Sequence, residues 1–170
     1  MTTATAIRVV RTVGVALVCG VLAGGAALGQ PSASEGRTIE GTWYIRVQPT
    51  DCATGLPIPN VPLINSLATF HAGGTLSEVP GGQGFAPGQR TPGHGLWHHE
   101  SGQTFSQKFT ALINFTTVPG FQEAGWQTVE QSAELLDRDT LSSAGTNAFY
   151  RTDGTLYRSG CSTATGHRFE

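Results

Sequence analysis

Apolar and polar residues alternate along much of the chain after residue 39. In residues 40–48, Trp43, Ile45 and Val47 fall on one face of an extended segment, and the residues between them fall on the other. This period of two is typical of a β-strand with one buried face. Gly41 precedes a large inward indole, which suits the closed end of a barrel, where a strand must bend and a bulky side chain must fill space. Residues 40–48 are therefore predicted to be the first strand of a β-barrel.

Seven further segments of this kind follow. The clearest runs from 103 to 115, where Phe105 and Phe109 share one face and polar residues occupy the other. The expected strands are residues 40–48, 63–71, 75–79, 96–100, 103–115, 121–131, 140–152 and 155–163. Residues 133–136 (Ala-Glu-Leu-Leu) predict a single helical turn, too short to be a stable helix. The chain is therefore predicted to be all-β, with short or no helices.

Glycine and proline mark the connections between these strands. Gly73-Gly74 and Asp153-Gly154 are two-residue hairpin signals, and the second is typical of a type I′ turn. Residues 80–95 contain six Gly and three Pro, and this irregular segment is the predicted loop at the barrel mouth. Short antiparallel links between eight strands predict an up-and-down antiparallel β-barrel, whose interior holds side chains or one small ligand. Closure requires the first strand to lie antiparallel to residues 155–163.

The start of the chain has the features of a secretory signal peptide. Two arginines precede an apolar stretch of about 16 residues, and Ala27-Leu28-Gly29 supplies small residues before a cleavage site. A transmembrane helix is the alternative, but the stretch is rich in Gly and shorter than the roughly 20 residues that a span needs. We expect a signal peptide over 1–29, a disordered leader over 30–38 and a single domain over 39–170. This arrangement predicts a secreted or periplasmic protein with no membrane span after cleavage.

The net charge and the absence of certain motifs argue against several classes of function for this protein. Of the ten basic residues, Arg8 and Arg11 leave with the signal peptide, so eight face twelve acidic residues and the net charge becomes −4. Binding to nucleic acid is not expected, because it needs clustered Lys and Arg side chains against the phosphates. The chain has no phosphate-binding glycine loop and no serine in a nucleophile elbow. We therefore expect no cofactor.

Cysteine usage predicts a disulfide bond. When Cys19 is lost with the signal peptide, Cys52 and Cys161 remain, an even number in an oxidising compartment. Their pairing closes a loop of about 110 residues, worth roughly 4–5 kcal/mol in the chain-entropy account. Two buried free thiols are the alternative. In the predicted antiparallel pairing, Cys52 lies opposite the start of the last strand and Cys161 near its far end, so the disulfide and the closure constrain each other.

Several motifs carry a resemblance to known families. Gly41-Thr42-Trp43 is similar to the G-x-W of lipocalins and other calycins, whose first strand carries that Trp at the closed end of an eight-stranded barrel. The chain more specifically resembles uncharacterised exported bacterial proteins. The shared features are a G-T-W strand, a T-F-x-x-G-G-T hairpin (69–75), a P-G-H-G-x-W segment (92–97) and a G-C-x-x-x-x-G-x-R-F-E end (160–170). The resemblance covers most of residues 40–170. It implies a calycin-like barrel and brings no established activity.

One histidine-rich segment supplies candidates for chemistry. His94, His98 and Glu100 are candidate catalytic residues, because a histidine that faces a pocket can act as an acid or a base. On a strand, His94 and His98 lie about 13 Å apart, too far to share one metal ion. His98 and His99 must point to opposite faces of the sheet. We therefore expect no metal site. The alternative is that His94 orders the loop and one of the adjacent pair is solvated.

Aromatic residues supply candidates for ligand contact. The predicted ligand-binding residues are Trp43, Trp97, His98, Phe105, Phe109 and Trp126. These aromatic side chains either line an apolar cavity or fill it, and the sequence leaves both interpretations open. Lys108 lies on the opposite strand face from Phe105 and Phe109, so we expect a solvated lysine on the outer wall.

Three functions are consistent with this pattern. The first is an exported protein that binds one small apolar or aromatic ligand in the barrel mouth, framed by residues 80–100. The second is a cofactorless cyclase or isomerase with an allene-oxide-cyclase-like or dirigent-like barrel, using His98 or His94 with Glu100. The third is a structural or interaction protein with a filled core. An interior space below roughly 100 Å³ favours the third, and a histidine in the cavity beside a carboxylate favours the second.

Overall fold

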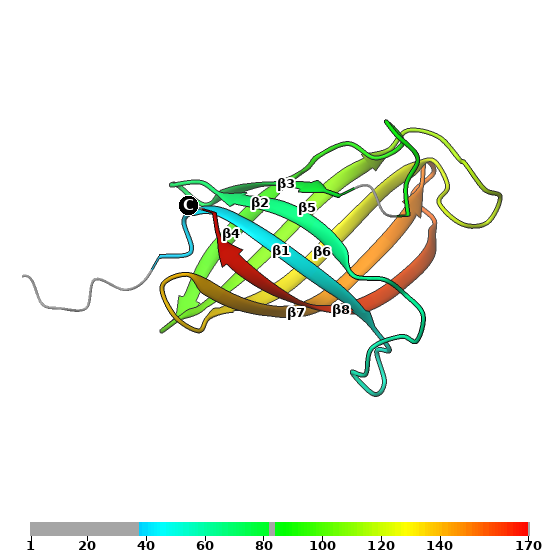
Figure 1. Ribbon diagram of the computed structural model, residues 1–170. Helices are drawn as coiled ribbons and strands as arrows, with labels where there is room; N and C mark the ends of the chain where they lie inside the picture. The colour runs from blue at the N-terminus through cyan, green and yellow to red at the C-terminus, as the bar shows by residue number, and fades with distance from the viewer. Residues whose placement is uncertain (1–37, 82–83, 170) are drawn as a thin grey trace, which may run out of the picture. The chain divides into compact units, whose positions relative to one another are not determined.

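The barrel expected from the sequence is present in the computed structural model, which describes residues 38–81 and 84–169 (Figure 1). Each strand is antiparallel to its neighbours, and the eighth pairs with the first, so the sheet closes on itself. The strands are β1 (Gly41–Thr50), β2 (Ile64–Phe70), β3 (Thr75–Pro80), β4 (Gly93–Ser101), β5 (Thr104–Ile113), β6 (Gly125–Leu135), β7 (Thr140–Arg151) and β8 (Leu156–Arg168). The described residues contain no helix, and thus none long and apolar enough to cross a membrane. The predicted signal peptide and nearly all of the predicted leader lie outside the described residues.

Alternation along each strand decides which side chains fill the barrel. On β1, Trp43 and Ile45 are buried, whereas Tyr44 between them is exposed. On β5, Phe105 and Phe109 are buried in the same way. Removing apolar surface from water stabilises a fold by about 25 cal/mol for each Å². A slip of one residue would turn these side chains to solvent, so they fix the register of each strand. The predicted strand faces are confirmed on β1 and β5.

One end of the barrel is closed around Trp43. Its indole Nε1 donates a hydrogen bond of 2.8 Å to the carbonyl of Ile39, so the one polar group of the indole is satisfied inside the core. Arg168, at the end of β8, places its guanidinium 4.3 Å from the centre of the Trp43 ring. The same guanidinium donates to the carbonyls of Glu40 and Thr38. The two ends of the described chain therefore meet at this closed end.

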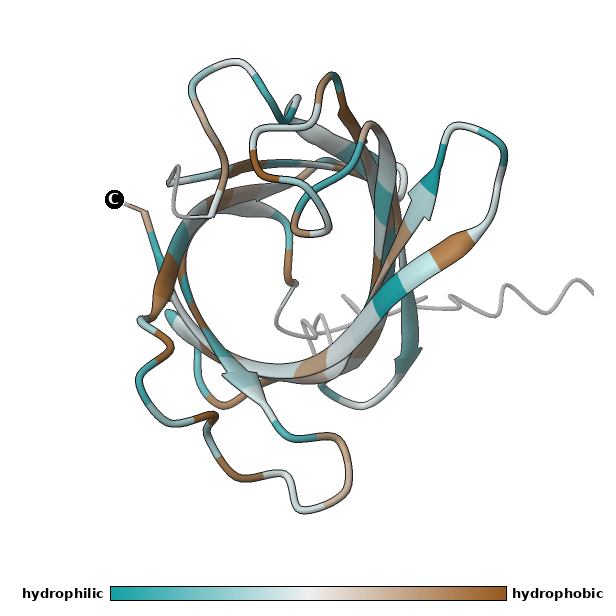
Figure 2. Cartoon of the chain, turned by 90° about the vertical axis from the view of Figure 1, so that its right-hand side faces the viewer, coloured by the Kyte–Doolittle hydropathy of each residue, from teal (hydrophilic) through white to brown (hydrophobic). Residues whose placement is uncertain are grey.

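The three longest connections between strands lie at the opposite end, which we call the mouth, together with one short turn. The mouth connections are residues 51–63, 81–92, 114–124 and 152–155, and the closed end has the short turns 71–74, 102–103 and 136–139. Figure 2 looks along the barrel from the mouth, with these loops around the ring of strands. The predicted mouth loop is shorter than residues 80–95, because β4 already begins at Gly93.

Two local predictions are wrong. Residues 133–136 do not form a helical turn. Ala133 and Leu135 belong to β6 and are buried, because their alternation with exposed neighbours continues the strand. Asp153-Gly154 does not form a type I′ turn, which needs positive φ at both central residues. Only Gly154 of this pair has a positive φ, 88°, and the hairpin uses a three-residue turn with glycine at its last position.

The pairing of β1 with β8 completes the barrel and removes the conflict between closure and disulfide. The sequence placed the end of the last strand near residue 163, but β8 continues to Arg168. Cys161 therefore lies in the middle of β8, directly opposite Thr50 at the end of β1. Cys52 follows two residues later and is bonded to Cys161, with a Cα–Cα distance of 5.2 Å. The predicted closure and the predicted disulfide are both confirmed.

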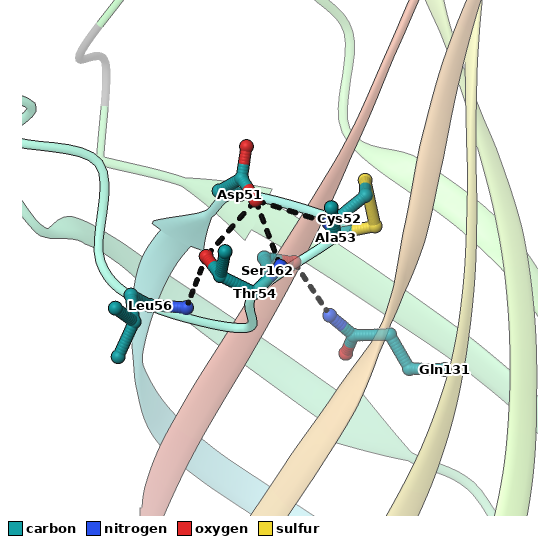
Figure 3. Close-up of a disulfide and its surroundings, with 8 residues drawn as sticks. Asp51, Cys52, Ala53, Thr54, Leu56, Gln131 and Ser162 are labelled. Carbon is teal, nitrogen blue, oxygen red and sulfur yellow. Dashed lines mark hydrogen bonds between the residues drawn. A yellow bond between two sulfur atoms is a disulfide. The ribbon is translucent and has the colours of Figure 1, made fainter.

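The loop that carries Cys52 is held locally by Asp51 (Figure 3). One carboxylate oxygen of Asp51 accepts hydrogen bonds from the N–H groups of Ala53 (3.0 Å) and Thr54 (2.8 Å), and from the Thr54 hydroxyl (2.9 Å). These bonds stabilise the charged form, so the pKa of Asp51 lies below its ordinary value of 3.8, with the Thr54 N–H as the largest cause. A charged Asp51 thus orders the turn beside the disulfide.

Candidate ligand-binding cavity

The barrel interior is hollow between its closed end and its mouth. The cavity has a volume of about 390 Å³, within the range of about 300–1,000 Å³ that small-molecule sites occupy. The part of the cavity nearer the closed end is lined by inward apolar side chains, namely Ile45, Ala68, Phe70, Phe109, Val129 and Leu141. Towards the closed end, Trp97 packs edge-on against Phe70 and Phe105, with ring centres 6.3 and 5.9 Å apart. The cavity volume is well above the roughly 100 Å³ below which a filled core is favoured.

Apolar side chains also surround the mouth. Ile58 and Val61 come from the loop after β1, Phe85 from the loop after β3, and Phe121 from the loop after β5. Ile58 and Phe121 remain 40% and 43% exposed. Figure 2 shows these loops around the end of the barrel. Exposed apolar groups gathered at an entrance are typical of ligand-binding and interaction sites.

A buried ion pair forms part of the cavity wall. Arg90, from the loop after β3, turns into the barrel, where its Nη2 atom lies 2.9 Å from Oε2 of Glu78 on β3. Glu78 also accepts a 2.6 Å hydrogen bond from the hydroxyl of Ser66, and Arg90 donates from Nε to Oε1 of Gln127 over 2.8 Å. Each charge therefore has an opposite charge and a neutral partner, as burial requires. This part of the wall is polar but carries no net charge.

Uncharged hydrogen-bonding groups form a second polar part of the wall. Gln131 on β6 lies at its centre. Its Oε1 accepts hydrogen bonds from Gln107 (2.9 Å) and Ser143 (3.1 Å), and its Nε2 donates to the hydroxyl of Ser162 over 3.2 Å. These four residues come from four consecutive strands, β5 to β8, and all of them line the cavity. The network fixes the orientation of neutral donors and acceptors that a ligand can meet.

Three of the six predicted ligand-binding residues lie towards the closed end. Trp43, Trp97 and Phe105 are buried in the core and do not line the open volume. Phe109 does line it, beside Val129 on the neighbouring strand. The sequence left open whether the aromatic side chains fill the interior or line it. They do both, because the closed end is filled and the cavity begins at the level of Phe109.

The other predicted site residues face away from the cavity. Trp126 stacks on a tyrosine of β7 with ring centres 5.4 Å apart and is not among the lining residues. His94, His98 and Glu100 are exposed on β4, on the face opposite to the buried Trp97. Strand parity gives the reason, since all three have even numbers and the inward Trp97 has an odd one. The arrangement that the isomerase hypothesis requires, a cavity-facing histidine beside a carboxylate, is not formed by these candidates.

Lys108 is also on the outer wall, and the described residues form no metal site. Lys108 is exposed, as predicted, and its Nζ atom lies 2.6 Å from a carboxylate oxygen of Glu130. The hydrogen bond and the charge of Glu130 raise the pKa of Lys108 above its ordinary value of 10.5. Within residues 38–81 and 84–169, no three His, Cys, Asp or Glu side chains are grouped closely enough to hold a metal ion.

The sequence analysis did not identify Glu78, Gln131 or Arg90 as residues of the cavity. Glu78 has the same strand parity as the buried Leu76, which is a signal for an inward position. Gln131 likewise shares its parity with the buried Val129. Arg90 gives no such signal, because it lies in a loop rich in Gly and Pro, where no periodicity applies. Two of the three could therefore have been found by extending the alternation to polar residues.

No protein-family model, curated protein or solved structure matches this chain. The geometry of the site is that of an apolar cavity, open at one end of a closed barrel, whose polar wall combines a buried ion pair with uncharged hydrogen-bonding groups. Such a cavity can hold a small molecule by burying its apolar surface and can orient it through a few hydrogen bonds.

Proposed function

We propose that this protein binds one small, largely apolar or aromatic ligand inside the barrel, outside the cytoplasm. The observation that carries the proposal is the cavity of about 390 Å³, which opens at the mouth and combines an apolar lining with a hydrogen-bonding wall. Burial of the ligand supplies affinity, at about 25 cal/mol for each Å² of apolar surface removed from water. The glutamine and serine side chains of the wall then select the orientation of the ligand.

The disulfide supports the location given in the proposal. A bond between Cys52 and Cys161 is consistent with an oxidising environment outside the cytoplasm. Together with the signal peptide expected over residues 1–29, it favours a secreted or periplasmic protein. The ligand is then a molecule available in that compartment.

Native mass spectrometry tests the proposal on protein purified from its own host. We expect a bound small molecule that is lost on denaturation. Val47→Trp provides the matched variant, because Val47 lines the cavity and an indole at this position occupies space that the ligand needs. Tyr44→Trp is the control, because Tyr44 lies on the same strand with the opposite parity and is 40% exposed.

Ligand occupancy should fall in the Val47→Trp protein and stay at the wild-type level in the Tyr44→Trp protein. Circular dichroism establishes that both variants are folded. The intact mass of each variant establishes that its disulfide is formed. If folded Val47→Trp protein carries the same ligand at the same occupancy as the wild type, the ligand binds outside the cavity and the proposal is wrong.

A further inference from the structure

We infer that the ligand is a monoanion with an apolar body, in the simplest case a carboxylic acid, and that Arg158 holds its anionic group at the cavity mouth. The apolar part of the ligand then lies inside the barrel. This ligand class rests on the proposed function, because the same cavity must bind the ligand.

The position of Arg158 places a cation at the entrance. Arg158 lies near the mouth end of β8 with the same parity as the buried Ser162 and Ala164, and it lines the cavity. Its guanidinium lies over the rings of Phe121 and Phe149, with 4.9 and 5.5 Å between Cζ and the two ring centres. Stacking on aromatic faces holds a guanidinium in place and leaves its edge N–H groups available for a further partner.

Arg158 has no opposite charge beside it in the part of the chain that the structure describes. Of the described side chains that line the cavity, two others are ionisable, Glu78 and Arg90, and these two neutralise each other. In the loop after β5, the carboxylate of Glu123 is held by Arg151 through contacts of 2.5 and 3.2 Å. The cavity lining therefore carries one uncompensated positive charge, and it lies at the entrance.

This positive charge stands out against the rest of the molecule. The whole chain has a net charge of −2, so a generally basic surface does not explain a cation at the mouth. The planar guanidinium matches a carboxylate, with which it forms two parallel charge-assisted hydrogen bonds. A cation at the rim of an apolar cavity suits an amphipathic anion, whose body loses water while its head group stays partly solvated.

The cavity volume limits the size of the ligand. The volume of about 390 Å³ equals that of about 13 water molecules at roughly 30 Å³ each. A ligand of about a dozen non-hydrogen atoms is therefore the right size. Decanoate and 2-naphthoate have this size, one flexible and one flat. Decanamide and 2-naphthamide have nearly the same shapes without the charge.

Titration calorimetry with these two matched pairs tests the role of Arg158. We expect the wild-type protein to bind at least one carboxylate about five- to tenfold more tightly than its amide, as one partly exposed charge-assisted hydrogen-bonded pair allows. Arg158→Gln should remove this preference and leave the affinity for the amide unchanged within twofold. Arg158→Lys keeps the charge and should keep part of the preference. Arg46→Gln is the charge-matched control, because Arg46 is exposed on the outer face of β1.

The outcomes separate this inference from the proposed function. Loss of the carboxylate preference in Arg158→Gln alone supports the role of Arg158. If the wild type binds the carboxylate and the amide equally in both pairs, or if Arg158→Gln keeps the preference, the inference is overturned. The cavity then binds ligands, but Arg158 does not select an anion. If no member of either pair binds, the proposed function loses its support together with the inference.

Discussion

Replacing Glu78 by glutamine tests how strongly the buried ion pair stabilises the cavity wall. The side chains of Glu78 and Arg90 are only 9% and 4% exposed, with 2.9 Å between Oε2 and Nη2. At an effective dielectric constant of about 20, such charges attract by about 6 kcal/mol, and desolvation offsets most of this attraction. Without the carboxylate, the guanidinium keeps only neutral partners, the side chain of Gln127 and the carbonyl of Thr91. We expect Glu78→Gln to lower the free energy of unfolding by about 3–5 kcal/mol.

Removing both charges should recover most of this loss. We expect Arg90→Met alone to cost a similar amount, because it leaves the Glu78 carboxylate buried without a cation. The double variant should lose only about 1–2 kcal/mol, since no unpaired charge remains, so the coupling energy of the cycle exceeds about 3 kcal/mol. Urea unfolding with the disulfide intact measures all four proteins, and the fluorescence of the buried Trp43 and Trp97 reports the transition.

An exposed ion pair provides the control for this cycle. Lys108 and Glu130 have side chains that are 65% and 55% exposed, so Glu130→Gln should leave the urea midpoint unchanged within error. If the double variant loses the sum of the two single losses, the charges of Glu78 and Arg90 do not compensate each other and the reasoning is refuted. An equal loss in Glu130→Gln would show that burial is not the cause.

Two further predictions concern the loop after β1. Cys52→Ser should lower the free energy of unfolding by about 2–5 kcal/mol, because the bond to Cys161 restricts the unfolded chain. Intact-mass analysis checks the bond itself, since labelling of both thiols without reduction would contradict it. Thr54→Val should raise the pKa of Asp51 towards 3.8 but not to it, because the Thr54 hydroxyl is lost and the N–H donors remain. Carbon-detected NMR titration measures this pKa. In the wild type, the stabilisation from charged Asp51 is complete above pH 3.8 and is lost as the pH falls through the lower folded-state pKa, and an unshifted pKa in Thr54→Val would refute the assignment.

The barrel was predictable because its signal is repeated along the chain. Trp43 and Ile45 alternate with exposed neighbours on β1 as Phe105 and Phe109 do on β5, so each strand gave independent evidence for the same architecture. The prediction failed where residue preference and periodicity disagreed. Residues 133–136 contain good helix formers, yet pairing with β5 and β7 extends the strand as far as Leu135. Tertiary pairing outweighed local preference there.

The cavity was less predictable than the fold. Its polar wall depends on Arg90, which reaches Glu78 from a loop whose course the sequence does not specify. The histidines were selected for their chemistry, but their strand parity is opposite to that of the inward Trp97, so His94 and His98 face outward. Residue type alone indicated the wrong face of β4, while strand parity indicated the right one. The volume left between Phe109 and the mouth follows from the closed barrel as a whole.

The disulfide also changes the connectivity of the barrel. Each of the seven other neighbouring strand pairs is joined by a turn or loop, and β1 and β8 are the one pair that the backbone leaves unlinked. The bond between Cys52 and Cys161 supplies that missing link at the mouth end of their shared edge, which runs from Trp43 opposite Arg168 to Thr50 opposite Cys161. The oxidised chain is thus a covalent ring around the barrel axis. Local opening of this edge can begin only at the closed end and stops at the cysteines, so the rim of the mouth keeps its circumference. Reduction converts the ring into a linear chain, whose wall can then part along its full height.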